Sequence, residues 1–279
     1  MTPIRIEVRT GAATHAGNLR SENQDSHLVR RPVFLVADGM GGHASGREAS
    51  ELVVRAFDHQ LWGPWVTPQT LKDATAVAAR AVADLGNRVS GAPGSTLTGA
   101  GLAVHDAEPC WLIFNVGDSR TYLLRDEELE QVTVDHSQQQ ALMDAGLTSR
   151  AAAASARKNV ITQAIGGGLA NEPVLDLWML PARSGDRVLL CSDGLTGELS
   201  DQLIAATLLS VTEPQDAAAA LVSAAVAGAG RDNVTAVVVD AVLVEGTRTE
   251  LREWSSDDTV DDTSAGLGGD TRADLEVAR

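Results

Sequence analysis

Short apolar runs, each bounded by turn-forming residues, constrain the fold of this chain more than any other feature. Runs of this length that are rich in Val, Leu and Ile and have glycine or polar neighbours are typical of β-strands. Such runs occupy residues 33–37, 101–105, 111–116, 121–124, 187–191 and 234–239. Aromatic residues make up only 3% of the chain, so we expect a core built mainly from Ala, Val and Leu.

Longer Ala-rich stretches with helical spacing lie between these runs. We expect helices at residues 46–60, 69–89, 137–145, 201–209 and 214–227. Strands and helices do not alternate regularly along the chain, which disfavours a doubly wound parallel sheet. The order of the elements therefore predicts an α+β layered fold.

The composition changes near Gly246. Residues 246–279 contain nine acidic and four basic side chains, interspersed with Gly, Ser and Thr. A segment that is this polar and charged cannot bury enough apolar surface to offset the entropy lost on folding. We predict one folded domain over residues 1–245 and an acidic, disordered tail over residues 246–279.

The net charge limits the classes of binding partner, and the cysteines limit the cellular compartment. The chain has 22 Lys and Arg against 38 Asp and Glu, and a net charge of −16 would repel the backbone of a nucleic acid. Cys110 and Cys191 lie in apolar runs, which fits reduced, buried thiols. No export signal is visible, and no apolar run reaches the length of about 18 residues that a membrane-spanning helix needs. We expect a cytoplasmic monomer without nucleic-acid or membrane partners.

Four aspartates flank the predicted strands. Asp38, Asp118 and Asp193 each follow an apolar run, and Asp232 precedes the last one. Without His or Cys at ligand spacing, such carboxylates favour a hard cation such as Mg²⁺ or Mn²⁺ over zinc. The alternative is that each aspartate only caps a turn, which is common for this residue type.

The surroundings of Asp38 favour the metal hypothesis. Residues 38–46 read Asp-Gly-Met-Gly-Gly-His-Ala-Ser-Gly, and four glycines in one loop allow the backbone to approach a bound ion closely. With this loop, the sequence resembles the metal-dependent Ser/Thr protein phosphatases, the PPM family, in their bacterial form. The matching motifs come in the family's order and spacing between residues 10 and 240, at residues 20–25, 38–43, 94–96, 115–120, 135–137, 161–166, 191–195 and 232–233.

The resemblance implies a four-layer α/β/β/α sandwich, with two antiparallel sheets flanked by helices and a two-metal centre at one end. It implies that residues 1–245 form the catalytic domain. By the family pattern, Asp38 bridges the two metals and the backbone carbonyl of Gly39 adds a ligand to one of them. Asp193 and Asp232 complete the other metal, and Asp118 with Asp193 holds a weaker third ion.

The resemblance also implies catalytic roles. Arg20 matches the arginine that binds substrate phosphate, and Asp25 is expected to hold metal-bound water unless it only caps a turn. His43 is a candidate donor of the leaving-group proton, and the alternative for it is a helix-start or surface role. Two divalent ions would share a water and activate it for in-line attack on phosphorus, without a phosphoenzyme. Cys191 lacks the basic loop of a cysteine phosphatase, so it is not expected to be the nucleophile.

The implied function is hydrolysis of phosphoserine and phosphothreonine on proteins, which reverses Ser/Thr kinase signalling. The expected partners are phosphorylated proteins, including a Ser/Thr kinase and its substrates. Residues 144–159 resemble the mobile flap beside the site, and the alternative for them is a loop without substrate contact.

Two other functions are alternatives to this one. One is a scaffold with the phosphatase fold that binds a partner without hydrolysis. A missing metal-ligand residue would indicate such a scaffold, and none is missing. The other is an enzyme with one dedicated partner, such as an anti-sigma-factor antagonist.

Overall fold

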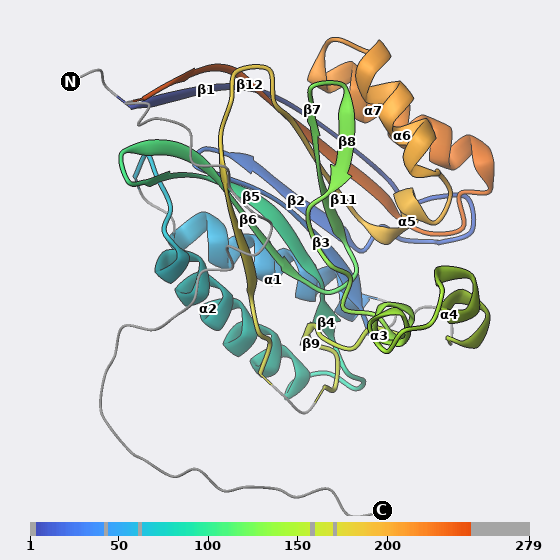
Figure 1. Cartoon of the computed structure of the whole chain (residues 1–279). Helices are drawn as coiled ribbons and strands as arrows, with labels where there is room; N and C mark the ends of the chain where they lie inside the picture. Colours follow the sequence, from blue (N-terminus) through green and yellow to red (C-terminus); the bar gives the residue numbers. More distant parts are fainter. Residues whose placement is uncertain (1–3, 42–43, 61–62, 157–159, 170–171, 247–279) are drawn as a thin grey trace, which may run out of the picture.

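Two antiparallel β-sheets pack face to face, and helices cover the outer face of each sheet (Figure 1). The computed structural model describes residues 4–41, 44–60, 63–156, 160–169 and 172–246. The expected α/β/β/α sandwich is confirmed. The prediction for residues 246–279 falls, apart from Gly246, outside the described residues. None of the helices in the described ranges combines the length and the apolar character that a membrane span requires.

The first sheet has five strands, and its centre is buried on both faces. In spatial order they are β1 (Arg5–His15), β12 (Val234–Glu245), β11 (Arg187–Cys191), β7 (Arg120–Arg125) and β8 (Glu128–Gln131). β11 is buried at all of its positions because it lies between two strands and two layers. This explains why its sequence is a continuous apolar run rather than an alternating one.

The second sheet carries its own set of strands. Their order is β10 (Asp176–Pro181), β6 (Glu108–Val116), β5 (Leu97–His105), β3 (Val33–Met40), β4 (Gly94–Ser95) and β9 (Ile165–Gly166), while β2 (Asp25–Arg30) also pairs with β3. Two-residue turns close the β5–β6 and β7–β8 hairpins. Asp106 and Ala107 in the first turn both have positive φ angles, as do Asp126 and Glu127 in the second. This geometry matches the right-handed twist of the paired strands.

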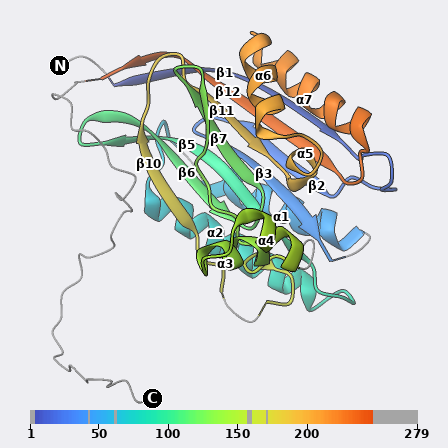
Figure 2. The same cartoon turned by 45° about the vertical axis from the view of Figure 1, so that its right-hand side comes forward.

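The helices form two outer layers and one separate pair. α1 (Ala44–Gln60) and α2 (Pro68–Gly86) cover the second sheet, and α5 (Asp193–Thr196), α6 (Asp201–Ser210) and α7 (Pro214–Gly228) cover the first (Figures 1 and 2). α3 (Gln138–Asp144) and α4 (Ser149–Ser155) pack mainly on each other. α4 lies within the predicted flap, residues 144–159, and α3 reaches it only with Asp144; residues 157–159 of the flap lie outside the described ranges.

Alternation along the strands divides the interior into an inner core and two outer cores. In β3, Phe34 and Val36 face the other sheet, while Leu35 faces the helices. Phe57 of α1 stacks on Phe114 of β6 at a centroid distance of 5.5 Å. Side chains of successive strand residues point to opposite faces of the sheet, so one short apolar run contributes to the inner core and to one outer core.

A buried ion pair joins the first sheet to the end of α6. The Arg187 guanidinium donates to both carboxylate oxygens of Asp240 at 2.7 and 2.8 Å. It also donates to the backbone carbonyls of Leu208 and Val211, each at 2.6 Å, and to that of Thr212. All five N–H donors of this arginine thus have acceptors, and the pair satisfies carbonyls that the helix end leaves open.

We expect Arg187→Leu to lower the free energy of unfolding by about 3–5 kcal/mol, because it leaves the Asp240 carboxylate buried and unpaired. Urea denaturation measures this loss. Arg55→Leu is the matched control, since Arg55 pairs with Glu51 on the exposed face of α1 and such pairs contribute about 1 kcal/mol or less. Equal effects of the two substitutions would contradict this account of the buried pair.

Candidate functional site

The predicted aspartates meet at one end of the sandwich, where strands of both sheets end. Asp38 lies within β3 rather than after a strand, and it is the pairing partner of Asp25 at the start of β2. Asp118 lies in the turn between β6 and β7, and Asp193 is the first residue of α5, just after β11. Asp232 lies two residues before β12.

The inner core becomes polar toward this end. Phe34 and Val36 face the first sheet, so the alternation of β3 places Asp38 on the same side of the strand. On the opposite sheet, Val237 of β12 belongs to the inner core and Thr235 is two residues nearer the site. The carboxylates are therefore the polar end of the layer between the two sheets.

Asp25 connects the two sheets through one carboxylate oxygen. Its Oδ2 accepts hydrogen bonds from the hydroxyls of Ser192 and Thr235, both at 2.7 Å. Its Oδ1 is buried and has no hydrogen-bond partner among the described residues. These donors are distant in sequence, so Asp25 does more than cap a local turn. Burial, partly offset by the two hydroxyls, raises the pKa of Asp25 to about 7.

Mutual repulsion adds to burial at the other aspartates. Burial, followed by the charges of Asp25 and Asp193, raises the pKa of Asp38 well above its usual range. Burial, followed by the charge of Asp193, raises the pKa of Asp118 to about 7. Burial, followed by the charge of Asp232, also raises the pKa of Asp193. The cluster therefore holds protons that a cation could replace.

Arg20 lies beside these carboxylates. Its Nη2 donates to Oδ2 of Asp232 at 2.6 Å, and Oδ1 of Asp232 accepts the amide N–H of Asn233 at 2.9 Å. The Arg20 side chain is 54% exposed, so part of its guanidinium faces solvent. Its pKa is raised, chiefly by the hydrogen bond to Asp232 and also by Asp38 and Asp193. A guanidinium in this position can bind a planar pair of phosphate oxygens.

The loop that carries Arg20 is fastened to the turn that carries Asp232. The side-chain amide of Asn233 donates to the carbonyls of Ala16 and Glu22, both at 2.9 Å, and its Oδ1 accepts the amide N–H of Gln24. Asn233 thus has a structural role, because its side chain joins these two segments. These bonds set the position of the guanidinium relative to the carboxylates.

The glycines after two of the aspartates allow close backbone approach. A Cβ on Gly39 would overlap the carbonyl oxygen of Gly46, and a Cβ on Gly194 would overlap that of Asn233. At each Asp-Gly pair, the glycine therefore allows another backbone segment to pass close by, next to the aspartate. Gly39 is itself buried and pairs with Ser95 of β4. His43, the predicted proton donor, lies outside the described residues.

The residues at this end suit a hard divalent cation. Only oxygen ligands are present, and two buried carboxylate oxygens, Oδ1 of Asp25 and Oδ1 of Asp118, have no partner in the described structure. A buried unpaired carboxylate is costly, and a cation with oxygen ligands would relieve that cost. Within the described ranges, no three Asp, Glu, His or Cys side chains are already arranged to hold an ion. Asp232 instead binds Arg20, so ion binding would require these side chains to move.

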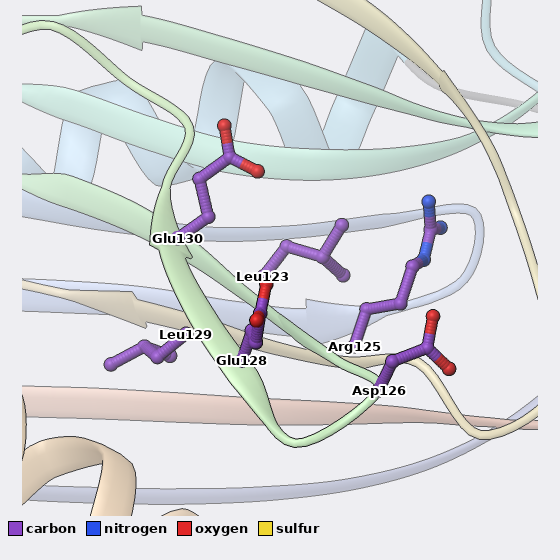
Figure 3. Close-up of a pocket in the computed structure, with 6 residues that line it drawn as sticks. All are labelled: Leu123, Arg125, Asp126, Glu128, Leu129 and Glu130. Atoms are coloured by element: carbon purple, nitrogen blue, oxygen red, sulfur yellow. The ribbon is translucent and has the colours of Figure 1, made fainter. Parts of the chain in front are cut away.

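Two other features do not belong to this site. Burial raises the pKa of the Cys191 thiol to about 12, which agrees with the prediction that it is no nucleophile. A hollow of about 420 Å³ lies at the β7–β8 turn, at the opposite end of β7 from Asp118 (Figure 3). It is lined by Leu123, Arg125, Asp126, Glu128, Leu129 and Glu130, and among the described residues its three carboxylates are not arranged to hold a metal ion.

Sequence analysis assigned no role to the hydroxyl residues around the carboxylates. Ser192 and Thr235 bind Asp25, and Thr96 donates its hydroxyl proton or accepts from Ser119 at 2.7 Å while binding the amide N–H of Asp38. Thr96, Ser119 and Ser192 lie within motifs that the sequence shows, and Thr235 lies two residues after the last of them. Their pairing across the two sheets could not be read from the sequence.

Comparison with known proteins gives a consistent result. The family model for protein phosphatase 2C matches residues 14–224. The chain is 36% identical to the serine/threonine protein phosphatase PstP of Mycobacterium tuberculosis over 87% of its own length. It covers 46% of that relative, so it spans about half the length of the protein it matches.

Two further similarities cover almost the whole of the matched protein. The serine/threonine phosphatase stp of Listeria innocua is 30% identical over 83% of this chain and 95% of its own length. The solved catalytic domain of PstP, in complex with two manganese ions, superposes with a TM-score of 0.73 at 36% identity. That superposition covers 86% of this chain and 100% of the solved chain.

The raised pKa values predict a pH dependence of stability without metal. Asp25 and Asp118 have folded-state pKa values of about 7 against an ordinary 3.8, so folding favours their protonated forms. The contribution of these two groups to stability is therefore greatest below pH 4, and it falls as the pH rises toward 7. We expect Asp118→Asn to reduce this fall between pH 5 and 7.5, as measured by urea unfolding in chelator. The exposed Asp126→Asn is the control, and equal slopes for all three proteins would contradict the prediction.

Proposed function

The chain belongs to the protein phosphatase 2C family, and we propose that it hydrolyses phosphoserine and phosphothreonine on other proteins. The observation that carries this proposal is the cluster of buried and half-buried aspartates beside the half-exposed Arg20 guanidinium. The similarity to named serine/threonine phosphatases over more than four fifths of the chain supports it. No expected ligand residue is missing, which disfavours a scaffold without turnover.

We infer that two Mn²⁺ or Mg²⁺ ions occupy the site, with a weaker third. Asp38 would bridge the two ions, the Gly39 carbonyl would contribute to one, and Asp193 and Asp232 would complete the other. Asp118, together with Asp193, would hold the third ion. When bound, such ions lower the pKa of a water and offset charge on phosphoryl oxygens. The two manganese ions in the PstP structure support this inference.

The protein's own residues would bind the substrate and orient the attacking water. The Arg20 guanidinium would bind phosphate oxygens and offset the charge they develop during displacement. Asp25 offers its unpartnered Oδ1 as an acceptor for a proton of that water, while Ser192 and Thr235 hold its other oxygen. For His43, the proposed role is protonation of the departing Ser or Thr oxygen, and the pH–rate profile of His43→Ala tests it.

The wider role follows from this activity. We propose that the protein reverses phosphorylation by a Ser/Thr kinase, and that its partners are phosphorylated proteins. We also propose that it acts as a cytoplasmic monomer. The two free, buried thiols, Cys110 and Cys191, are compatible with a reducing compartment.

Hydrolysis of a phosphothreonine peptide tests the proposed reaction. We expect activity with Mn²⁺, loss of activity in excess chelator, and a fall in kcat of at least about a hundredfold in Asp38→Asn, because a carboxylate central to charge stabilisation is removed. Asp126→Asn should match the wild type. Activity that survives chelation, or an Asp38→Asn protein as active as the wild type, would refute the proposed metal-dependent mechanism.

A further inference from the structure

The turn that carries Asp118 is held through the residue before it. The amide N–H of Gly117 donates to Nδ1 of His136 at 3.0 Å. The carbonyl of Gly117 accepts the backbone N–H of His136 at 2.9 Å and the side-chain amide of Asn115 at 3.0 Å. Gly117 has a φ of +112°, and a Cβ there would lie 2.7 Å from the Thr96 side chain. Both backbone polar groups of Gly117 are therefore fixed from one side of the turn.

These contacts define the tautomer of His136. Its Nδ1 accepts a hydrogen bond from the Gly117 amide N–H, so the ring proton is on Nε2, which donates to Oδ2 of Asp176 at 2.9 Å. Asp176 is the first residue of β10, and its pairing partner in β6 is Asn115. The His136 side chain is only 11% exposed. One buried imidazole therefore links the edge strand β10 to the Asp118 turn.

His136 also lies at the base of the α3–α4 segment. Its carbonyl accepts the amide N–H of Thr162 at 2.8 Å, and the next residue, Ser137, caps α3. Gln138 donates its amide N–H to the carbonyl of Val160 at 2.9 Å. Residues 136–138 and 160–162, which lie on either side of the predicted flap at 144–159, thus pair with each other beside the same histidine.

We propose that His136, oriented by Asp176, is the positioning residue for Asp118. It fixes Gly117 so that the Asp118 carboxylate, whose Oδ1 is buried without a partner, is presented to the carboxylate cluster. This inference rests on the proposed function, because Asp118 is assigned there to the weaker third ion. Loss of the Nδ1 acceptor would leave the Gly117 N–H unpaired and free the turn to rotate its carboxylate away.

Manganese titration by calorimetry tests this role independently of activity. We expect His136→Leu, which fills a similar volume without an acceptor, to weaken the third Mn²⁺ about 10- to 100-fold and to leave the two tighter ions unchanged. His136→Asn can place its Oδ1 near the position of Nδ1, so we expect it to retain affinity within about threefold of the wild type. Asp176→Ala, which frees the ring to change tautomer or orientation, should weaken the same ion.

The outcomes separate this inference from the proposed function. Asp118→Asn should abolish the weak Mn²⁺ signal, and failure of the wild type to bind Mn²⁺ at all would overturn both. If Asp118→Asn removes the weak ion while His136→Leu binds it like the wild type, only the positioning role is overturned. Should His136→Leu not fold, His136→Asn decides: retained affinity supports the role, and a loss as large as that of Asp118→Asn contradicts it.

Discussion

Burying several carboxylates next to one another is the constraint on which the rest of this structure depends. Without a cation, burial and mutual repulsion raise the pKa values of Asp25, Asp38, Asp118 and Asp193 together. Isolated side chains would move apart or turn to solvent. They stay together here because rigid strands of both sheets end at the same place and because short loops fasten those ends to each other.

The layer between the sheets becomes more polar toward the carboxylate cluster. Large apolar side chains such as Trp111 fill its middle. Nearer the site, the hydroxyls of Thr98 and Thr121 meet at 2.8 Å across the sheets. The carboxylate of Asp25 then reaches the hydroxyl of Thr235 on the opposite sheet. Each of these polar side chains thus has a hydrogen-bond partner on the opposite sheet, and Oδ1 of Asp25, where the path ends, has none in the described structure.

Sequence analysis could locate the site but not the contacts that support it. The apolar runs predicted the central strands and a layered α+β fold, while the resemblance to a family predicted the sandwich and the end where the carboxylates gather. β1, β2 and β10 were missed because these strands are partly exposed and polar residues interrupt their apolar pattern. The bond from Ser192 to Asp25 and the one from His136 to Asp176 join positions far apart in sequence. Pairings of this kind follow from the packing of the two sheets rather than from local spacing.

The central claim is that protons stabilise the carboxylate cluster in the place of cations, and proton release on metal binding tests it most directly. Metal-free protein is titrated with Mn²⁺ at pH 6.5 by calorimetry in two buffers with different heats of ionisation. The account predicts release of at least about one proton per protein molecule, since the raised pKa values of Asp25, Asp118 and Asp38 keep part of the cluster protonated at pH 6.5 before the ions bind. A binding heat that is the same in both buffers would mean that no proton leaves and would contradict the claim.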